Sequence, residues 1–287
     1  MTLQKIEAQN KKLESILALH KGKSFDYSSI PHDFEKFNKY IGLPKHPESL
    51  EERPLTPAQL DFIKSYTTKD VDWIHLNKAR QCGWTELILR ILAYNAFFKY
   101  KGKKIGIIAG TSGITTKQIF DRFRELFANI PETVNENGPL KITLHNGTEI
   151  YGAKASVEAF TGWTKFGAFL MDESAKWDRI DDTPVLDSIL PIARSNHADV
   201  FMISTPNGPR GFFYHIGINE NSEFKHAEYN IHKGGKGLYT KEEIQQMINS
   251  SEEDPNQEYL CQYTIGRESI WGNLEEDDYD GVEEYSL

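Results

Sequence analysis

One short stretch of this chain, residues 77–85, limits its possible folds more than any other. It follows an apolar run and precedes an amphipathic run from Glu86 to Tyr100, so a strand, a tight turn and a helix are predicted in succession. Such a turn can bind phosphate, because a helix N-terminus presents unpaired N–H groups and the positive end of its dipole. Gly83 and Thr85 match the second glycine and the hydroxyl of the common phosphate-loop pattern.

Two positions of the stretch depart from that pattern. Lys78 replaces the first glycine and Trp84 replaces the usual lysine, so the loop carries its lysine at the start. Arg80 adds a second cation. A lone match of this quality is more often an ordinary strand-to-helix turn, so the rest of the sequence must decide between the two interpretations.

Length and composition favour a soluble globular α/β protein. The 287 residues are 39% hydrophobic and can build one or two domains, and strand-length runs alternate with helix-length runs. Seven of the nine net negative charges lie beyond residue 274. The remainder is close to neutral, so overall acidity does not exclude nucleic acid as a partner.

The cysteines and the hydropathy pattern indicate a reducing compartment and no membrane partner. Cys82 and Cys261 are the only cysteines, too few for a disulfide framework or a cysteine-rich zinc site. The N-terminus lacks the apolar core of a signal peptide, and no apolar stretch approaches the roughly 20 residues that span a bilayer.

Three segments are expected along the chain. Residues 1–50 are predicted to form an N-terminal helical appendage, with helices near 3–17 and 34–40, that packs on the main domain or on a partner; a partly ordered arm is the alternative. Residues 51–270 carry the main domain. Residues 271–287 form an acidic tail that is expected to be disordered.

Two buried strands are predicted to end in polar loops. The apolar run 166–171 is typical of a central parallel strand, and it is followed by Asp172 and Glu173. A pair of acids at the end of a buried strand is costly unless it coordinates something. The next apolar run, 199–203, leads into a loop rich in proline and glycine that begins with Ser204, Thr205 and Pro206.

A helix is predicted just upstream of the phosphate loop. Thr56 is a good N-cap residue and Pro57 suits the first helical position. Gln59, in the first turn, can pair with the edge of an adenine, or it is an ordinary surface glutamine. The other predicted elements are a strand at 105–109, helices at 111–130, 183–195, 240–250 and 255–263, a hairpin at 141–152 and an edge strand at 224–231.

These loops supply the groups that ATP hydrolysis requires. The carboxyl ends of parallel strands share one edge of the sheet, where ligands bind in open α/β folds. Thr85 and Asp172 are predicted to hold Mg²⁺, and Glu173 to orient the attacking water. Lys78 and Arg80 are the candidate phosphate cations, with Lys78 ranked first. The predicted nucleotide contacts are Gln59, Lys78, Ala79, Arg80, Gln81, Cys82, Gly83, Trp84 and Thr85.

Taken together, the segments resemble the ATPase domain of the terminase large subunit, the DNA-packaging motor of tailed viruses. The likeness covers roughly residues 55–214 and weakens towards 270. Residues 57–59 resemble the adenine-binding motif, and residues 78–85 resemble a deviant Walker A with an early lysine and an aromatic in the vacated position. The remaining matches are to Walker B with its catalytic glutamate (170–173) and to the coupling motif (203–208 with 211–214), which in that family links hydrolysis to DNA movement.

The resemblance implies a P-loop NTPase of the ASCE type, with a central, mainly parallel sheet flanked by helices. It implies ATP and Mg²⁺ as ligands, and double-stranded DNA, the portal and the small terminase subunit as partners. The expected assembly is a homo-oligomeric ring when active and a monomer in isolation, in the cytoplasm of the infected host cell. Another nucleic-acid-dependent P-loop ATPase, or a weakened nucleotide-binding structural domain, is the alternative.

Two departures from the family pattern bear on these expectations. Many terminases carry an arginine shortly before Walker B, where this chain has Thr161. Lys165, Arg194 or Arg210, from the same or a neighbouring subunit, is a possible substitute. The family also adds a nuclease domain after the ATPase, and this chain ends at Leu287; a truncation, a split gene and a motor without its own nuclease are the alternatives.

Overall fold

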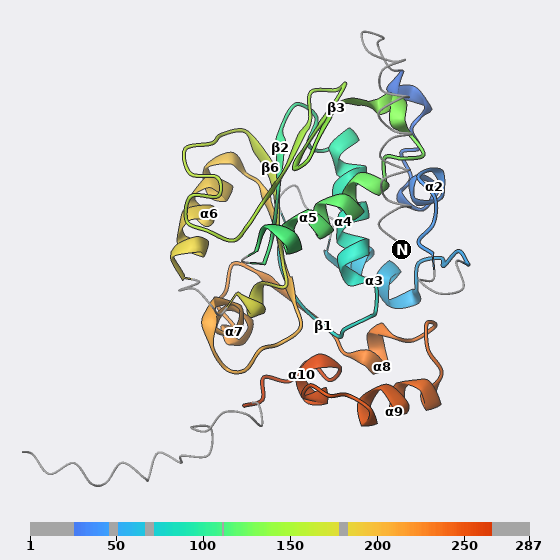
Figure 1. Ribbon diagram of the computed structural model, residues 1–287, viewed down its shortest axis with the longest axis vertical. Coiled ribbons are helices and arrows are strands. Elements are labelled where there is room, and N and C mark those ends of the chain that lie inside the picture. The colour runs from blue at the N-terminus through green and yellow to red at the C-terminus, as the bar shows by residue number, and fades with distance from the viewer. Residues whose placement is uncertain (1–25, 46–50, 67–71, 111, 178–182, 266–287) are drawn as a thin grey trace, which may run out of the picture.

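A computed structural model describes residues 26–45, 51–66, 72–110, 112–177 and 183–265 (Figure 1). The helix predicted near residues 3–17 and the acidic tail lie outside these ranges. In the described ranges, no helix combines the length and apolar character needed to cross a membrane.

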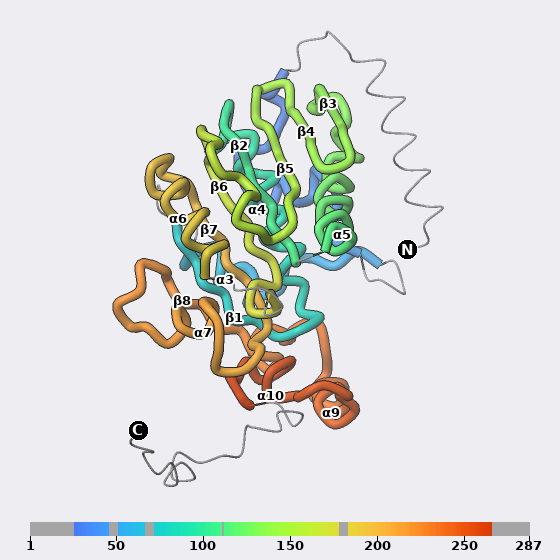
Figure 2. Tube along the Cα trace, turned by 60° about the vertical axis from the view of Figure 1, so that its left-hand side comes forward, coloured from blue at the N-terminus to red at the C-terminus, as the bar shows by residue number. Residues whose placement is uncertain are grey.

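One eight-stranded sheet forms the centre of the domain, in the order β3-β4-β5-β2-β6-β7-β1-β8 (Figure 2). All neighbours pair in parallel except β3 with β4 and β4 with β5, which confirms the predicted mainly parallel α/β sheet. The strands are β1 (Trp73–Lys78), β2 (Lys104–Ala109), β3 (Val134–Gly138), β4 (Lys141–Leu144), β5 (Glu149–Ala153), β6 (Phe166–Asp172), β7 (Asp199–Ser204) and β8 (Lys225–Tyr229).

Helices cover both faces of the sheet (Figure 1). One group of four packs on one face, two helices pack on the other, and three short helices lie beyond the ends of β1 and β8. In that order they are α2 (Phe34–Tyr40), α3 (Pro57–Tyr66), α4 (Trp84–Phe97) and α5 (Gly113–Glu125); α6 (Thr183–Asn196) and α7 (Gly211–Ile218); and α8 (Ile231–Gly234), α9 (Lys241–Asn249) and α10 (Pro255–Glu258).

Several predicted boundaries were wrong, and the hydrogen bonds explain them. β1 continues through Lys78, because Asn77 and Lys78 still pair with β8, so the loop begins later than predicted. The helix predicted at 111–130 ends at Glu125, after which the chain continues in turns. The helix predicted at 255–263 ends at Glu258, since the carbonyl of Tyr259 accepts from Ile231 instead of continuing the helix. β3 was not predicted.

The described part of the N-terminal segment packs directly on α4. Phe37 of α2 is fully buried, and its ring centroid lies 5.4 Å from that of Tyr94. Arg90 of α4 donates to the Asn38 side chain at 2.6 Å and to the Gly42 carbonyl at 2.8 Å. These contacts brace the helix that follows the phosphate loop.

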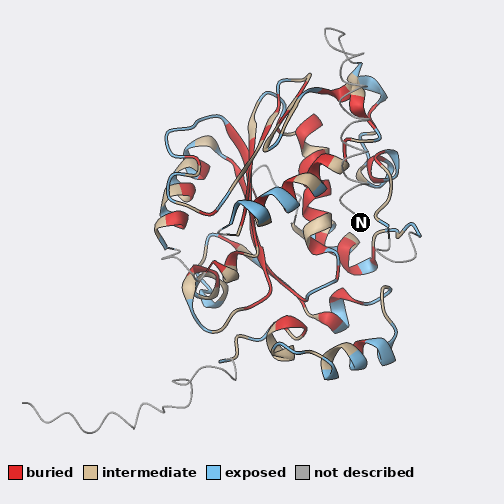
Figure 3. Ribbon diagram, in the orientation of Figure 1, coloured by how far each residue is buried: buried red, intermediate tan, exposed pale blue. Residues whose placement is uncertain are grey.

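Trp84, the first residue of α4, belongs to the core. Its side chain is 1% exposed, and its ring centroid lies 4.3 Å from that of Tyr229 in β8 and 5.7 Å from that of Phe62 in α3 (Figure 3 shows the burial of these elements). The aromatic in the usual lysine position therefore joins α4 to α3 and β8.

We expect Trp84→Ala to lower the free energy of unfolding by roughly 3–5 kcal/mol, because the lost aromatic contacts leave a cavity. Urea unfolding followed by circular dichroism measures the change. Ile114→Ala, at a helical position that is 74% exposed, is the control and should change stability by no more than about 0.5 kcal/mol. A loss below about 1 kcal/mol for Trp84→Ala would contradict this account of α4.

Candidate active site

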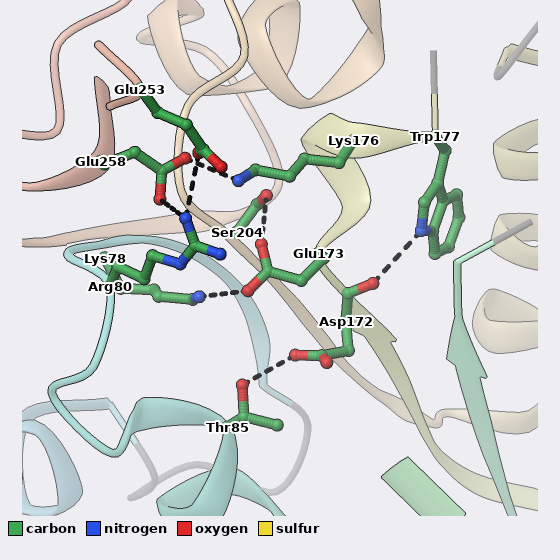
Figure 4. Close-up of polar contacts among 10 residues, drawn as sticks. All are labelled: Lys78, Arg80, Thr85, Asp172, Glu173, Lys176, Trp177, Ser204, Glu253 and Glu258. Carbon is green, nitrogen blue, oxygen red and sulfur yellow. Dashed lines mark hydrogen bonds and ion pairs between the residues drawn. The ribbon is translucent and has the colours of Figure 1, made fainter. Parts of the chain in front are cut away.

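The predicted site residues meet at one edge of the sheet. β7 lies between β6 and β1, so the carboxyl ends of these three strands are neighbours. Each contributes a polar residue there: Lys78 from β1, Asp172 from β6 and Ser204 from β7 (Figure 4). The expected convergence of the three loops follows from parallel pairing and is observed.

The loop between β1 and α4 adopts a backbone that leaves donors available. Gln81 has φ 61° and Gly83 has φ 73°, and these left-handed conformations turn the chain into α4. Ala79 and Arg80 donate their N–H groups to the carbonyls of Tyr229 and Glu258. Among the described residues, none accepts from the N–H groups of Cys82, Gly83, Trp84 or Thr85. A helix N-terminus with unpaired N–H groups suits a phosphate.

Gln59 is buried, so the surface interpretation was wrong. Gln59 and Thr56 form a reciprocal capping pair. Gln59 Oε1 accepts from the Thr56 backbone N–H at 3.0 Å, and the Gln59 backbone N–H donates to Thr56 Oγ1 at 3.2 Å. Its Nε2 donates to the Cys82 carbonyl at 3.3 Å. Gln59 thus connects α3 to the phosphate loop, and the predicted pairing with adenine stays a prediction.

An ion pair joins the ends of β1 and β6. The ammonium of Lys78, a buried residue, contacts Glu173 Oε1, and Ser204 Oγ donates to Glu173 Oε2 at 3.3 Å. Burial opposes ionisation of Glu173, but the charge and hydrogen bond of Lys78 outweigh it and lower the pKa of the carboxyl. Glu173 also has φ 49°, a conformation that costs energy outside glycine and is often found at functional sites.

Asp172 lies deeper than Glu173 and contacts Thr85. Thr85 Oγ1 donates to Asp172 Oδ1 at 2.9 Å, and Trp177 Nε1 donates to the Asp172 carbonyl at 3.2 Å. Burial, reinforced by the charge of Glu173, raises the pKa of Asp172 to about 6, against the opposite effect of Lys78. A hydroxyl beside a buried carboxylate is an oxygen donor set that fits Mg²⁺, which usually takes one or two protein oxygens together with substrate phosphates.

Four charged residues form a second cluster beside Glu173 that the sequence analysis missed in part. Arg80 Nη1 lies 3.0 Å from Glu253 and 3.3 Å from Glu258, and Lys176 Nζ lies 2.6 Å from Glu258 (Figure 4). Arg80 was predicted, whereas the other three were not. Lys176 is three residues beyond Glu173, which is the only signal that could have found it.

The candidate substitutes for the family arginine fall in different places. Thr161 donates to the Val157 carbonyl at 2.7 Å. Lys165 immediately precedes β6 and Arg194 lies near the end of α6, before β7 begins, so both are at the opposite end of the strands from Glu173. Arg210 follows β7 and lies on the loop at the site edge. Within one subunit, only Arg210 of the three is on the correct edge.

The fold is that of an α/β P-loop NTPase-like domain. A profile of the family described as "Terminase large subunit, T4likevirus-type, N-terminal" matches residues 75–277. The chain belongs to this family, and membership indicates a DNA-packaging motor. Among curated proteins, none matches the chain.

Solved phage terminases share the fold. The large terminase ATPase domain of Thermus phage P74-26 aligns with a TM-score of 0.58 at 17% identity, over 80% of this chain and 98% of that domain. A large terminase from a thermophilic bacteriophage aligns with a TM-score of 0.60 at 14% identity, over 78% of this chain and 57% of that protein. A second structure of that bacteriophage protein, in complex with ADP, aligns with a TM-score of 0.58 at 13% identity, over 73% and 54%.

The raised pKa of Asp172 predicts how stability changes with pH. The folded state holds this proton more tightly than the unfolded chain, whose aspartate pKa is about 3.9, so the contribution of Asp172 to stability falls as pH rises from about 4 to 6. We therefore expect Asp172→Asn to raise the free energy of unfolding at pH 8 by roughly 1–3 kcal/mol.

Urea unfolding of the parent and of Asp172→Asn at pH 4, 6 and 8, without nucleotide, measures this difference. The difference in the free energy of unfolding between Asp172→Asn and the parent should grow with pH and be smallest at pH 4. Glu220→Gln, which removes an exposed acid in the turn between α7 and β8, is the control and should give no such trend. A destabilising effect of Asp172→Asn at pH 8 would contradict the prediction.

Proposed function

We propose that this domain hydrolyses ATP with Mg²⁺ and uses the energy to move double-stranded DNA into a procapsid. One observation carries the proposal: Lys78, Thr85, Asp172 and Glu173 converge at the end of the loop, where the N–H groups of residues 82–85 have no acceptor among the described residues. Family membership and the shared fold of terminase ATPase domains support it. A phosphate-release assay with and without DNA tests it directly.

The residues of the chain divide the work of hydrolysis among them. The loop N–H groups and Lys78 bind and neutralise the phosphates. Thr85 and Asp172 hold Mg²⁺, which supplies charge neutralisation on the phosphoryl oxygens. Glu173 orients the attacking water and accepts its proton, and its low pKa keeps the carboxylate ionised.

The contact between Lys78 and Glu173 makes phosphate binding and base activity interdependent. An ammonium that neutralises Glu173 weakens it as a base, and the same ammonium is needed by the phosphates. Arrival of the triphosphate draws Lys78 away and frees Glu173 next to the reacting phosphate. Because Ser204 donates a hydrogen bond to Glu173, this change alters a contact at the start of the loop after β7, the segment that resembles the coupling motif.

The partners follow from the proposed role in packaging. We propose double-stranded DNA as the substrate track, the portal and the small terminase subunit as assembly partners, and a ring of subunits as the active form, in the cytoplasm of the infected host cell. Arg210, on the loop at the site edge, and the exposed cations Lys165 and Arg194 are the residues to test for a role across a subunit boundary.

Glu173→Gln should abolish turnover while ATP still binds. Loss of a general base slows the chemical step by roughly 10²–10⁴-fold, and the amide leaves Lys78 available for phosphate. Phosphate release and ATPγS binding by calorimetry are measured on the same preparation. Glu136→Gln, at a remote exposed acid, is the matched control. Hydrolysis by Glu173→Gln at the parent rate would show that another group orients the water.

Lys78→Ala should weaken ATPγS binding by roughly 10–100-fold, the value of a charge-assisted hydrogen bond to phosphate. Arg80→Ala, at a half-exposed cation, should have a smaller effect. Because Lys78→Ala also leaves Glu173 without its partner, the double variant Lys78→Ala/Glu173→Gln is measured alongside and should bind equally weakly. If Arg80→Ala loses binding and Lys78→Ala does not, the arginine is the phosphate cation.

A further inference from the structure

Three cations on the phosphate side of this site are each paired with a carboxylate. Lys78 contacts Glu173, while Arg80 and Lys176 both contact Glu258 (Figure 4). The first pair involves groups with assigned roles. The second is unexpected, because Glu258 comes from α10, far along the chain from the phosphate loop and from the turn after β6.

Glu258 is placed between two separate loops. It is 4% exposed, and its Oε1 accepts from Lys176 Nζ at 2.6 Å. Its Oε2 lies 3.3 Å from Arg80 Nη1, close enough for an ion pair, yet it makes no hydrogen bond with the described residues. Its backbone carbonyl accepts from Arg80 N at 2.8 Å. The backbone contact fixes Arg80 at the loop whatever its side chain does.

This arrangement is an unfavourable way to stabilise a fold. Burial raises the pKa of Glu258, although Lys176 works in the opposite direction. One of its oxygens makes no hydrogen bond with the described residues, so the ion pair with Arg80 compensates its burial on that side. A group that presents two charged oxygens to Arg80 and Lys176 offers them what a phosphate would offer. When a triphosphate occupies the loop, Arg80 and Lys176 can therefore pair either with Glu258 or with the phosphates.

We propose that Glu258 is a positioning residue that competes with the nucleotide phosphates for Arg80 and Lys176, and that Lys176 is a third phosphate-binding cation. This inference rests on the proposed ATPase function. In the arrangement described here, Glu258 pairs with both cations, and Glu253 shares Arg80 through a hydrogen bond at 3.0 Å. When phosphates displace its carboxylate, Arg80 and Lys176 turn to the nucleotide, while the Arg80 backbone stays tied to α10.

The helix that carries Glu258 also contacts the loop after β7. The neighbouring residue, Gln257, accepts a hydrogen bond from Gly208 N at 2.6 Å through its Oε1. One short helix thus contacts the phosphate cations through Glu258 and the coupling loop through Gln257. A change of partner by Arg80 and Lys176 therefore takes place one residue from the contact at Gly208.

The test is ATPγS binding by calorimetry to the full chain and to three variants. Glu258→Gln keeps the size of the side chain but removes the competing charge, so we expect binding to tighten by roughly fivefold, as the loss of about 1 kcal/mol of competition implies. Glu220→Gln is the control: it removes an exposed acid in the turn between α7 and β8, so binding should change less than about twofold.

Lys176→Gln is the variant that keeps the test decisive if Glu258→Gln does not fold. The Lys176 side chain is 34% exposed, and loss of its ammonium should weaken binding by roughly fivefold if it takes a phosphate. A purely structural Glu258 would lower the thermal midpoint of Glu258→Gln without tightening its binding. Unchanged or weaker binding by folded Glu258→Gln, or unchanged binding by Lys176→Gln, overturns the inference.

ATPγS binding by the parent protein distinguishes failure of the Glu258 inference from failure of the proposed ATPase function. If the parent binds ATPγS and neither variant differs from it, the ATPase assignment stands and the role of Glu258 is wrong. If the parent itself binds no ATPγS in the presence of Mg²⁺, the proposed function fails, and the inference fails with it.

Discussion

The ion pair between Lys78 and Glu173 is the interaction on which the rest of the site depends. It joins the ends of β1 and β6 across β7, and its ammonium is on a side chain that is only 6% exposed, where an unpaired charge is costly. Removing one partner leaves a charge that only another ion can compensate. A nucleotide triphosphate supplies that ion, so the same contact that orders the site also makes it responsive to the nucleotide.

Residues at the end of β8 and beyond it anchor the phosphate loop. Carbonyls of Tyr229 and Glu258 accept from the first two N–H groups of the loop, and the Tyr239 hydroxyl donates to the Gln81 carbonyl at 2.9 Å. The start of the loop is therefore anchored from the C-terminal side of the domain, while its end stays open at the start of α4. This division leaves donors available where a phosphate is needed.

Much of the fold could be predicted, because parallel strands and amphipathic helices leave periodic patterns in the sequence. The strands that end at Asp172 and Ser204 were visible as apolar runs, and the helix that starts after Thr56 was marked by its cap. β3 carries residues without a clear alternation, so its pairing with β4 was missed. The end of α10 was misplaced because the distant amide of Ile231 donates to the Tyr259 carbonyl, a contact that local propensity does not contain.

By itself, the sequence determined which groups are available: a lysine at the start of the loop, an acid pair after a buried strand, and a hydroxyl in the first turn of a helix. Parallel pairing then allowed one edge of the sheet to be inferred. Only the tertiary structure decided that Trp84 packs into the core and that Arg80 is paired with acids of the last helices. Glu258 lies 178 positions from Arg80, and no periodicity or motif connects them. Such contacts depend on how the last helices pack against the end of the sheet, and that packing is a property of the whole chain.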